Sequence, residues 1–224
     1  MKKRHELKYM INEADHLTLR SRFSKLFSQD KHVGEVGEYH IRSLYFDTPG
    51  DRALMEKING VNRREKFRLR MYNLNTDYIR LEKKSKDNGL GRKQSAKMSA
   101  EQVAKLIEGD IDWMLESDSD LILELYSKMT GQLLRPKTIV DYIRAPFTYE
   151  PGNVRLTLDR DIRTGLLSTD FLNPQLTTVH TFETYALLEV KYDAYLPEVV
   201  RHAIQLIGRE QTAFSKYAVC RKYG

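Results

Sequence analysis

Arginine and lysine alternate with apolar residues in two neighbouring stretches, and this spacing is suited to contacts with phosphate. The stretches are KFRLRMYN at 66–73 and YIRLEKK at 78–84. Alternate side chains of a β-strand point to the same face. Each stretch therefore places a row of charges on one face, with Lys66, Arg68 and Arg70 in the first and Arg80, Glu82 and Lys84 in the second. The planar guanidinium group of arginine suits two-pronged contact with phosphate oxygens, whereas lysine acts as a point charge.

Charged residues share a face in the other predicted strands as well. The pairs are Glu6 with Lys8, Tyr142 with Arg144, Arg155 with Asp159, and Glu189 with Lys191. One interpretation is an open sheet with helices on one face and water on the other. The other is a barrel in which these residues point inward. A lumen rich in cations repels itself when empty, so a barrel predicts a bound polyanion, with the carboxylates available to hold Mg²⁺ or Mn²⁺. Alternation alone leaves both interpretations open.

The elements that position these rows form an α+β pattern with a largely antiparallel sheet. We predict one domain over residues 1–224, with helices packed against the sheet. Strands are expected at about 5–11, 39–47, 63–72, 77–86, 136–147, 153–162 and 185–193. Helices are expected after a cap at Asn12, near 52–58, at 99–109 with a capping box from Ser99, at 116–130, and from Pro197 to Gly208.

Some local details are also predicted from this pattern. The Asn-Gly pair and neighbouring glycine of SKDNGLG predict a loop over 85–91. Helical spacing places Leu26 on the core-facing side of the first helix and Ile207 on that of the last.

Composition limits the class of protein. The 224 residues include 37 Lys and Arg against 31 Asp and Glu, which gives a net charge of +6 and favours an anionic partner. Cys220 is the only cysteine, so the chain forms no internal disulfide and no thiolate metal cluster. No run approaches the roughly 18 apolar residues of a membrane span, and the N-terminus lacks the apolar core of a signal peptide. We therefore predict a cytoplasmic protein.

Eight motifs, in order along almost the whole chain, resemble those of the VTC domain. This is the polyphosphate polymerase domain of the vacuolar transporter chaperone family, within the triphosphate tunnel metalloenzymes. The motifs are RHELKY at 4–9, YFDT at 45–48, RLRMY at 68–72, LEKKSK at 81–86, DYIRAPF at 141–147, RLTLDRDI at 155–162, LLEVKY at 187–192 and FSKY at 214–217.

This resemblance implies an antiparallel β-barrel that forms a basic tunnel, with helices outside. It implies transfer of the γ-phosphate of ATP to a growing polyphosphate chain, with Mn²⁺ or Mg²⁺ as cofactor. The implied catalytic residues are Arg68, Arg70, Lys84 and Arg144. The implied phosphate-binding residues are Lys8, Lys93, Arg155, Lys191 and Lys216, and the implied metal ligand is Glu189.

One departure bears on the choice within the superfamily. The CYTH proteins often begin with Glu-x-Glu-x-Lys, but here Arg4 replaces the first carboxylate ahead of Glu6 and Lys8. This favours a polymerase over a triphosphatase. The alternatives are a triphosphatase and a module that binds polyphosphate without turnover. Sequence-specific nucleic-acid binding is not expected, because no recognition helix or paired aromatic platform is present. Any coupling to a membrane would need a membrane-protein partner.

Overall fold

The computed structural model describes residues 4–30, 33–34, 36–87, 90–181 and 185–223. The chain forms two compact units, each assembled from segments far apart in the sequence. Unit 1 consists of Met1–His40, Tyr142–Ile162 and His180–Ser215; unit 2 consists of Ile41–Asp141, Arg163–Val179 and Lys216–Gly224. The single domain expected over 1–224 stays a prediction.

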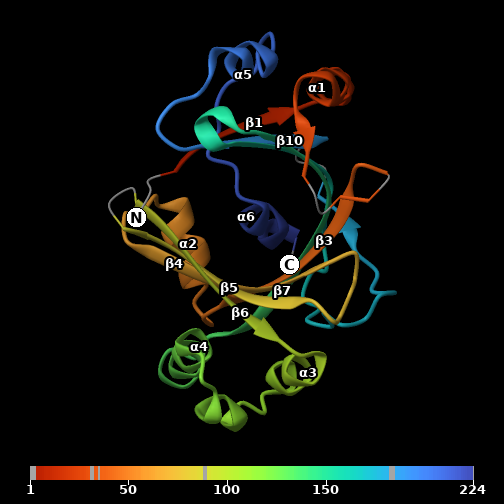
Figure 1. Ribbon diagram of the computed structural model, residues 1–224. Coiled ribbons are helices and arrows are strands. Elements are labelled where there is room, and N and C mark those ends of the chain that lie inside the picture. Colours follow the sequence, from red (N-terminus) through yellow and green to blue (C-terminus); the bar gives the residue numbers. More distant parts are fainter. Residues whose placement is uncertain (1–3, 31–32, 35, 88–89, 182–184, 224) are drawn as a thin grey trace. The chain divides into compact units, whose positions relative to one another are not determined.

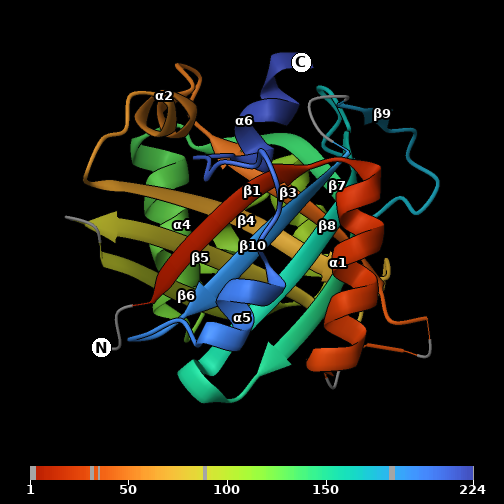
Figure 2. The same ribbon diagram turned by 90° about the horizontal axis from the view of Figure 1, so that it is seen from above.

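Unit 1 is an antiparallel sheet with two helices on one face. Strand β10 pairs antiparallel with both β1 and β8, and β7 follows β8 in the order β1-β10-β8-β7. Its elements are β1 (His5–Ile11), α1 (Glu13–Leu26), β2 (Ser28–Gln29), η2 (Pro151–Asn153), β8 (Val154–Thr164), β9 (Val179–His180), β10 (Ala186–Tyr192), α5 (Glu198–Ala203) and the second half of β7 (Arg135–Tyr149). Helices α1 and α5 lie over β8 and β10 (Figure 2).

The core of unit 1 forms because one parity of each strand is apolar. Leu156 and Leu158 of β8 and Leu188 of β10 pack with Leu19 and Phe23 of α1 and with Val200 of α5. Helix α1 begins where Asn12 accepts a hydrogen bond from the Asp15 amide at 2.8 Å, as the sequence predicts. The opposite parity of the same strands, which carries the charged residues, is left on the other face of the sheet.

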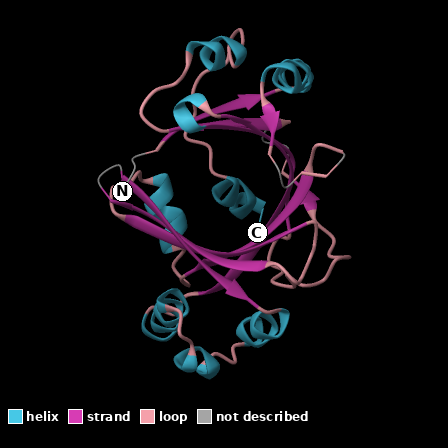
Figure 3. Ribbon diagram, viewed as in Figure 1, coloured by secondary structure: helices cyan, strands magenta, loops and turns pink. Residues whose placement is uncertain are grey.

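Unit 2 repeats this plan with a longer sheet, ordered β7-β3-β4-β5-β6. Its elements are β3 (Tyr39–Asp47), α2 (Arg52–Ile58), β4 (Arg64–Tyr72), β5 (Ile79–Asp87), β6 (Leu90–Met98), α3 (Ala100–Glu108), η1 (Asp112–Glu116), α4 (Asp120–Gly131), α6 (Lys216–Cys220) and η3 (Arg221–Tyr223). Helices α3 and α4 cover one face of β5 and β6 (Figures 1 and 3). Phe67, Leu69 and Leu81 pack there with Leu106 and Leu125.

Most of the predicted elements are present, and the α+β class with antiparallel strands is confirmed. Strands at 5–11 and 39–47 and the helix at 52–58 have the predicted bounds. Ser99 accepts a hydrogen bond from the Gln102 amide at 3.1 Å, which confirms the predicted capping box.

Three local predictions are wrong. The expected loop over 85–91 is largely strand, because β5 continues to Asp87 and β6 begins at Leu90, with those two residues paired; positions 88–89 lie outside the described residues. Leu26 is 46% exposed rather than buried. Ile207 is fully exposed, because α5 ends at Ala203 and the chain leaves the helical path before reaching it.

In the described part of the chain, no helix has both the length and the apolar character needed to cross a membrane.

Candidate functional site

On the charged face of unit 1, one carboxylate stands among three cations. Glu189 of β10 is 7% exposed. Its Oε1 atom lies 3.5 Å from Lys8 Nζ, and its Oε2 atom lies 3.1 Å from Lys191 Nζ and 3.6 Å from a terminal nitrogen of Arg144. The sheet sets this arrangement, because Lys8 of β1 is the register partner of Glu189. We call Glu189, Lys8, Lys191 and Arg144 the Glu189 cluster.

Two further carboxylates share the cations of this cluster. Asp159, which is fully buried, accepts hydrogen bonds from Nε and a terminal nitrogen of Arg144, both at 2.6 Å. Burial acts to lower the pKa of Arg144. The negative charges of Asp159 and Glu189 outweigh burial, so this pKa lies well above its usual value. Glu6 lies 3.6 Å from Lys8 and 3.2 Å from Lys191. Positive and negative charges on this face are therefore close to balance.

Arg155 of β8 lies beside the cluster rather than in it. Its Cα register partner is Lys191. One terminal nitrogen lies 3.1 Å from Asp30 and donates to the hydroxyl of Tyr39 at 3.2 Å. The Nε atom of Arg155 and the hydroxyl of Thr157, which faces Glu189 across the strands, are buried and have no hydrogen-bond partner among the described residues. Buried polar groups normally have such a partner, so this face has polar atoms available to a ligand.

Unit 2 also carries a buried carboxylate among cations, but holds it more tightly. Glu82 of β5 is 2% exposed, and its Oε2 atom accepts from two nitrogens of Arg68, at 2.8 and 2.6 Å. Lys93 of β6 forms an ion pair with Oε1, and Arg70 approaches Oε2 to 4.0 Å. Burial acts to raise the pKa of Glu82, but the charges of Arg68, Arg70 and Lys93 outweigh it and hold that pKa far below its usual value. We call these four residues the Glu82 cluster.

The face around the Glu82 cluster is strongly cationic. Lys84 lies between two lysines in the sheet, because its Cα register partners are Lys66 and Lys93. Glu82 is the one carboxylate that the described residues of β4, β5 and β6 place on this face, by strand parity and register. The cations of the same parity are Arg64, Lys66, Arg68, Arg70, Arg80, Lys84, Lys86, Lys93 and Lys97.

A buried tyrosine completes this face. Tyr45 of β3 accepts a hydrogen bond from Arg68 at 2.9 Å, and Lys66 Nζ lies 5.4 Å from its ring centre. Burial acts to raise the pKa of Tyr45, but the positive charges of Arg68, Lys66 and Arg70 lower it to about 7. The phenol therefore exchanges its proton near neutral pH.

Helix α6 places Lys216 in unit 2. The next residue, Tyr217, stacks on Tyr45 with ring centres 4.9 Å apart and donates a hydrogen bond to Asp47 at 2.5 Å. Asp47 also accepts from the backbone amides of Ala53 and Leu54 at the start of α2. Burial and the charge of Asp47 raise the pKa of Tyr217, so this hydroxyl stays protonated and anchors the short helix that carries Lys216.

The predicted site residues thus form two sets. Unit 1 holds Lys8, Arg144, Arg155, Glu189 and Lys191; unit 2 holds Arg68, Arg70, Lys84, Lys93 and Lys216. Sequence reasoning placed Glu82 on a charged face but gave it no role, and it missed Tyr45, Asp47 and Asp30. The sequence signal for Glu82 was its parity with Arg80 and Lys84, whereas its place opposite Arg68 comes from the strand register.

The residues around Glu189 fit a divalent cation only in part. A carboxylate is an oxygen ligand of the kind that Mg²⁺ and Mn²⁺ accept, and the Thr157 hydroxyl beside it lacks a partner. Among the described residues, however, no three His, Cys, Asp or Glu side chains gather closely enough to hold a metal by themselves. The site therefore suits a cation that takes its remaining ligands from water and from phosphate oxygens.

Several solved structures resemble this chain at low sequence identity. The PH1819 protein from Pyrococcus horikoshii OT3 matches 97% of this chain and 96% of its own at 11% identity, with a TM-score of 0.50. A proposed adenylate cyclase from Bacillus halodurans is 15% identical over 91% of this chain and 83% of its own, with a TM-score of 0.49. The PH1012 protein from Pyrococcus horikoshii OT3 is 14% identical over 91% and 85%, with a TM-score of 0.46.

No curated protein sequence matches the chain. The model of the VTC domain family matches residues 3–223. This match bears out the resemblance carried by the eight motifs, and with it the predicted fold class: α+β, with an antiparallel sheet of the triphosphate tunnel kind and helices packed outside. The chain belongs to the VTC domain family.

Proposed function

We propose that this protein is a metal-dependent phosphotransferase that moves the γ-phosphate of ATP onto a growing polyphosphate chain. Membership of the VTC domain family supports a function concerned with polyphosphate or triphosphates, and proteins of the wider triphosphate tunnel group are often enzymes. The observation that carries the proposal is the Glu189 cluster. Its carboxylate is buried, and three cations of unit 1, which lie 3.1 to 3.6 Å from it, also lie near Glu6 or Asp159. In the proposal, phosphate binds these cations and the carboxylate binds a metal ion.

The reaction needs positive charge and alignment more than a protein nucleophile. A terminal oxygen of the acceptor phosphate attacks the γ-phosphorus, the bond from that phosphorus to the β–γ bridging oxygen breaks, and ADP leaves. Charge spreads over the phosphoryl oxygens in the transition state, so cations that meet these oxygens accelerate the step.

Each predicted cation has a place in this proposal. Arg144 is fixed by Asp159 and presents its guanidinium group beside Glu189. In the proposal Arg68, Arg70, Lys84 and Arg144 stabilise the developing charge. The residues that hold phosphates in place are Lys8, Lys93, Arg155, Lys191 and Lys216. Glu189 would hold Mn²⁺ or Mg²⁺, which supplies positive charge against the phosphates when bound.

A second candidate is a module that binds polyphosphate without turnover. The cationic face of unit 2 favours it, because cations far outnumber Glu82 there and attract a polyanion by charge alone. The Glu189 cluster argues for the enzyme, since a pure polyanion binder gains nothing from a carboxylate set among its cations. A triphosphatase of the same superfamily would release free phosphate instead. Cytoplasmic location and a membrane-protein partner stay predictions from the sequence.

The test is to incubate the purified chain with ATP and either Mn²⁺ or Mg²⁺ and to separate the products on a gel. Long phosphate chains together with ADP are the expected result. Free phosphate without chains would move the protein to the hydrolases. Binding of added polyphosphate without any turnover would leave the binding module.

A further inference from the structure

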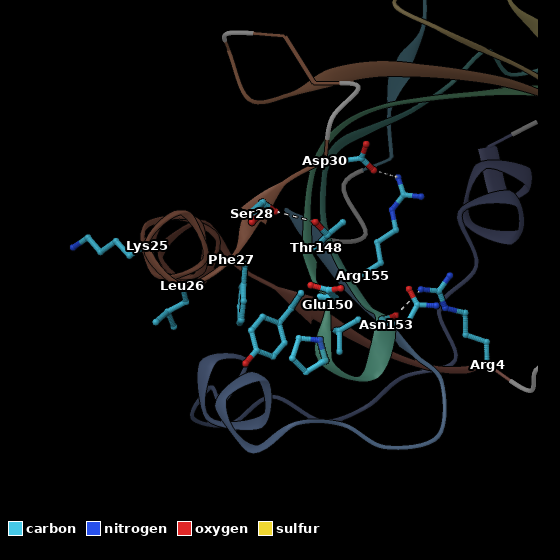
Figure 4. A pocket seen from close by; sticks show the side chains of 13 residues that line it. Arg4, Lys25, Leu26, Phe27, Ser28, Asp30, Thr148, Glu150, Asn153 and Arg155 are labelled. Atoms are coloured by element: carbon cyan, nitrogen blue, oxygen red, sulfur yellow. Dashed lines mark hydrogen bonds and ion pairs between the residues drawn. The ribbon is translucent and has the colours of Figure 1, made fainter.

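A polar pocket of about 820 Å³ lies in unit 1, close to the Glu189 cluster. It is bounded by the end of α1, by β2 and by the hairpin between β7 and β8, and all its lining residues belong to unit 1 (Figure 4). We propose that this pocket binds the base and sugar of a nucleoside triphosphate whose phosphates extend toward Lys191 and Glu189. This inference rests on the proposed function and names the part of the substrate that the cation rows leave unrecognised.

Arg155 connects the pocket to the Glu189 cluster. It lines the pocket, and on the sheet it is the register partner of Lys191, two residues along β10 from Glu189. Asp30 and Tyr39 hold one of its terminal nitrogens, which fixes the direction of the guanidinium group. Its buried Nε–H group lacks an acceptor within the described residues. A phosphate oxygen entering from the pocket is a suitable acceptor for a charged donor of this kind.

An aromatic wall stands elsewhere in the same pocket. Phe27 and Tyr149 both line it, and their ring centres lie 5.5 Å apart at 61°. Phe27 is only 7% exposed and also packs on Phe23 of the core, so it fixes the half-buried ring of Tyr149. Every nucleic-acid base has a flat π face that packs on aromatic side chains. This wall therefore suits a base and offers nothing to an inorganic phosphate chain.

Charged residues that line the pocket determine how a nucleoside triphosphate would be oriented in it. Glu150 lines the pocket, and its side chain makes no hydrogen bond or ion pair with any described residue. A carboxylate accepts hydrogen bonds from amino groups of a base and from sugar hydroxyls, but it repels phosphate. Arg155 and Arg4 lie on one side of the view in Figure 4, with Phe27 and Leu26 on the other. The phosphates thus belong near Arg155, and the base belongs near Tyr149 and Glu150.

The experiment compares two ligands that differ only in whether the phosphates carry a nucleoside. Calorimetry would measure the affinities of the full chain for ATP and for inorganic tripolyphosphate. The wild type is expected to prefer ATP. Tyr149→Ala should weaken ATP binding by about fivefold or more, since stacking of a base on an aromatic ring is worth that much, and should leave tripolyphosphate binding unchanged. Tyr149→Phe should retain the preference, and Tyr126→Ala, at a half-buried tyrosine of α4 in unit 2, is the matched control.

The outcomes separate this inference from the function on which it rests. If both ligands bind equally well and Tyr149→Ala changes neither affinity, the pocket does not recognise a nucleoside, while the proposed function stands. If Tyr149→Ala lowered the affinity for both ligands by the same factor, this would indicate general damage to unit 1 and would also contradict nucleoside recognition by the pocket. If the wild type binds neither ligand, the proposed function fails and the inference fails with it.

Discussion

Glu82 and Glu189 are both buried carboxylates set among arginine and lysine on the face of an antiparallel sheet, yet their surroundings differ. Glu82 receives two hydrogen bonds from Arg68 at 2.8 and 2.6 Å, and its other oxygen pairs with Lys93. Within unit 1, Glu189 accepts a hydrogen bond from Lys191 at 3.1 Å, and Lys8 and Arg144 lie 3.5 and 3.6 Å from it. These cations are shared with Glu6 and Asp159.

Because their partners differ, we infer different roles for Glu82 and Glu189. The Arg68–Glu82 pair satisfies its charges internally, so Glu82 is a counter-ion that keeps a row of like charges folded. The cations near Glu189 have alternative carboxylates. We therefore propose that they can bind phosphate while Glu189 binds a metal ion, so that the same residue type has a structural role in unit 2 and an exchangeable one in unit 1.

The largest loss of folding stability is expected from Glu82→Gln. Removing one partner of a buried ion pair leaves the arginine poorly compensated, and this costs about 3–5 kcal/mol of unfolding free energy. Chemical denaturation would measure it, with Glu6→Gln, a half-exposed carboxylate of unit 1, as the control. A loss below about 1 kcal/mol would show that Glu82 is as exchangeable as Glu189, and the contrast between the clusters would disappear.

The pH dependence of stability should follow the same assignment. Because the pKa of Glu82 in the folded protein is lowered below its ordinary value of 4.5, the contribution of Glu82 to stability is complete above that pH and is lost as the pH falls. The wild type should therefore lose stability below about pH 4.5. The difference between wild type and Glu82→Gln should shrink over that range, and acid titration of both proteins under denaturant would test this.

Catalysis should respond most to Glu189→Gln. Loss of one charged group that acts on the transition state typically costs about 10²- to 10³-fold in rate. We expect chain formation from ATP to fall by at least about 10²-fold while the affinity for polyphosphate stays the same or increases, because a negative charge has left the cationic face. Unchanged turnover would show that Glu189 is not the exchangeable carboxylate.

Ionisation of Tyr45 should have a smaller effect per pH unit on folding stability. Its pKa of about 7 in the folded protein lies below the ordinary tyrosine value of 10.0, so its stabilising contribution is complete above pH 10 and is lost as the pH falls through 7. Between those values the stability of the wild type relative to Tyr45→Phe should rise with pH, by at most about 1.4 kcal/mol per unit. Ultraviolet difference absorbance should show one phenolate near neutral pH in the wild type alone, and an equal signal in both proteins would contradict this.

That phenolate also gives a test for ligand binding in unit 2. Tripolyphosphate bound near Arg68 and Arg70 would bring negative charge toward Tyr45 and raise its pKa. Adding tripolyphosphate at pH 8 should therefore reduce the phenolate absorbance of the wild type and take up protons. No change at saturating ligand would place the bound phosphates away from the Glu82 cluster.

The smallest change in stability and in polyphosphate binding is expected from Lys93→Ala. The Lys93 side chain is about half exposed, and exposed ion pairs contribute about 0.2–1 kcal/mol. Binding of polyphosphate should weaken a few-fold and depend less steeply on salt. Arg92→Ala is the matched control, because Arg92 lies on the opposite face of β6. If Lys93→Ala and Arg92→Ala weakened polyphosphate binding equally, binding would not depend on which face of β6 carries the cation.

Much of the fold was predictable because its signals are local. The cap at Asn12, the capping box at Ser99 and the alternation in 39–47 each depend on residues close together in the sequence. Strand β6 was missed because LGRKQSAKM has no β-branched or aromatic residue, and its place depends on pairing with β5. Helix α6 was missed because it is short and is held by a partner far away in the sequence, since Tyr217 donates a hydrogen bond to Asp47.

The site was predictable to the level of faces but not of partners. Alternation shows which residues share a face, and register then brings Lys8 opposite Glu189 and Arg68 opposite Glu82. The sequence does not say that Arg144 would be fixed by Asp159, or that Lys93 would reach Glu82. Those contacts depend on how far side chains reach across strands, so the different surroundings of the two carboxylates appear only in the structure.

We propose that Glu189, and not Glu82, binds the metal ion when phosphate is bound. The most direct test is the affinity for Mn²⁺ in the presence of tripolyphosphate, followed by electron paramagnetic resonance of the free ion. We expect tight binding by the wild type and by the Glu6→Gln control, and at least about tenfold weaker binding by Glu189→Gln, equal to 1.4 kcal/mol or more. Equal Mn²⁺ binding by Glu189→Gln and the wild type would contradict the account.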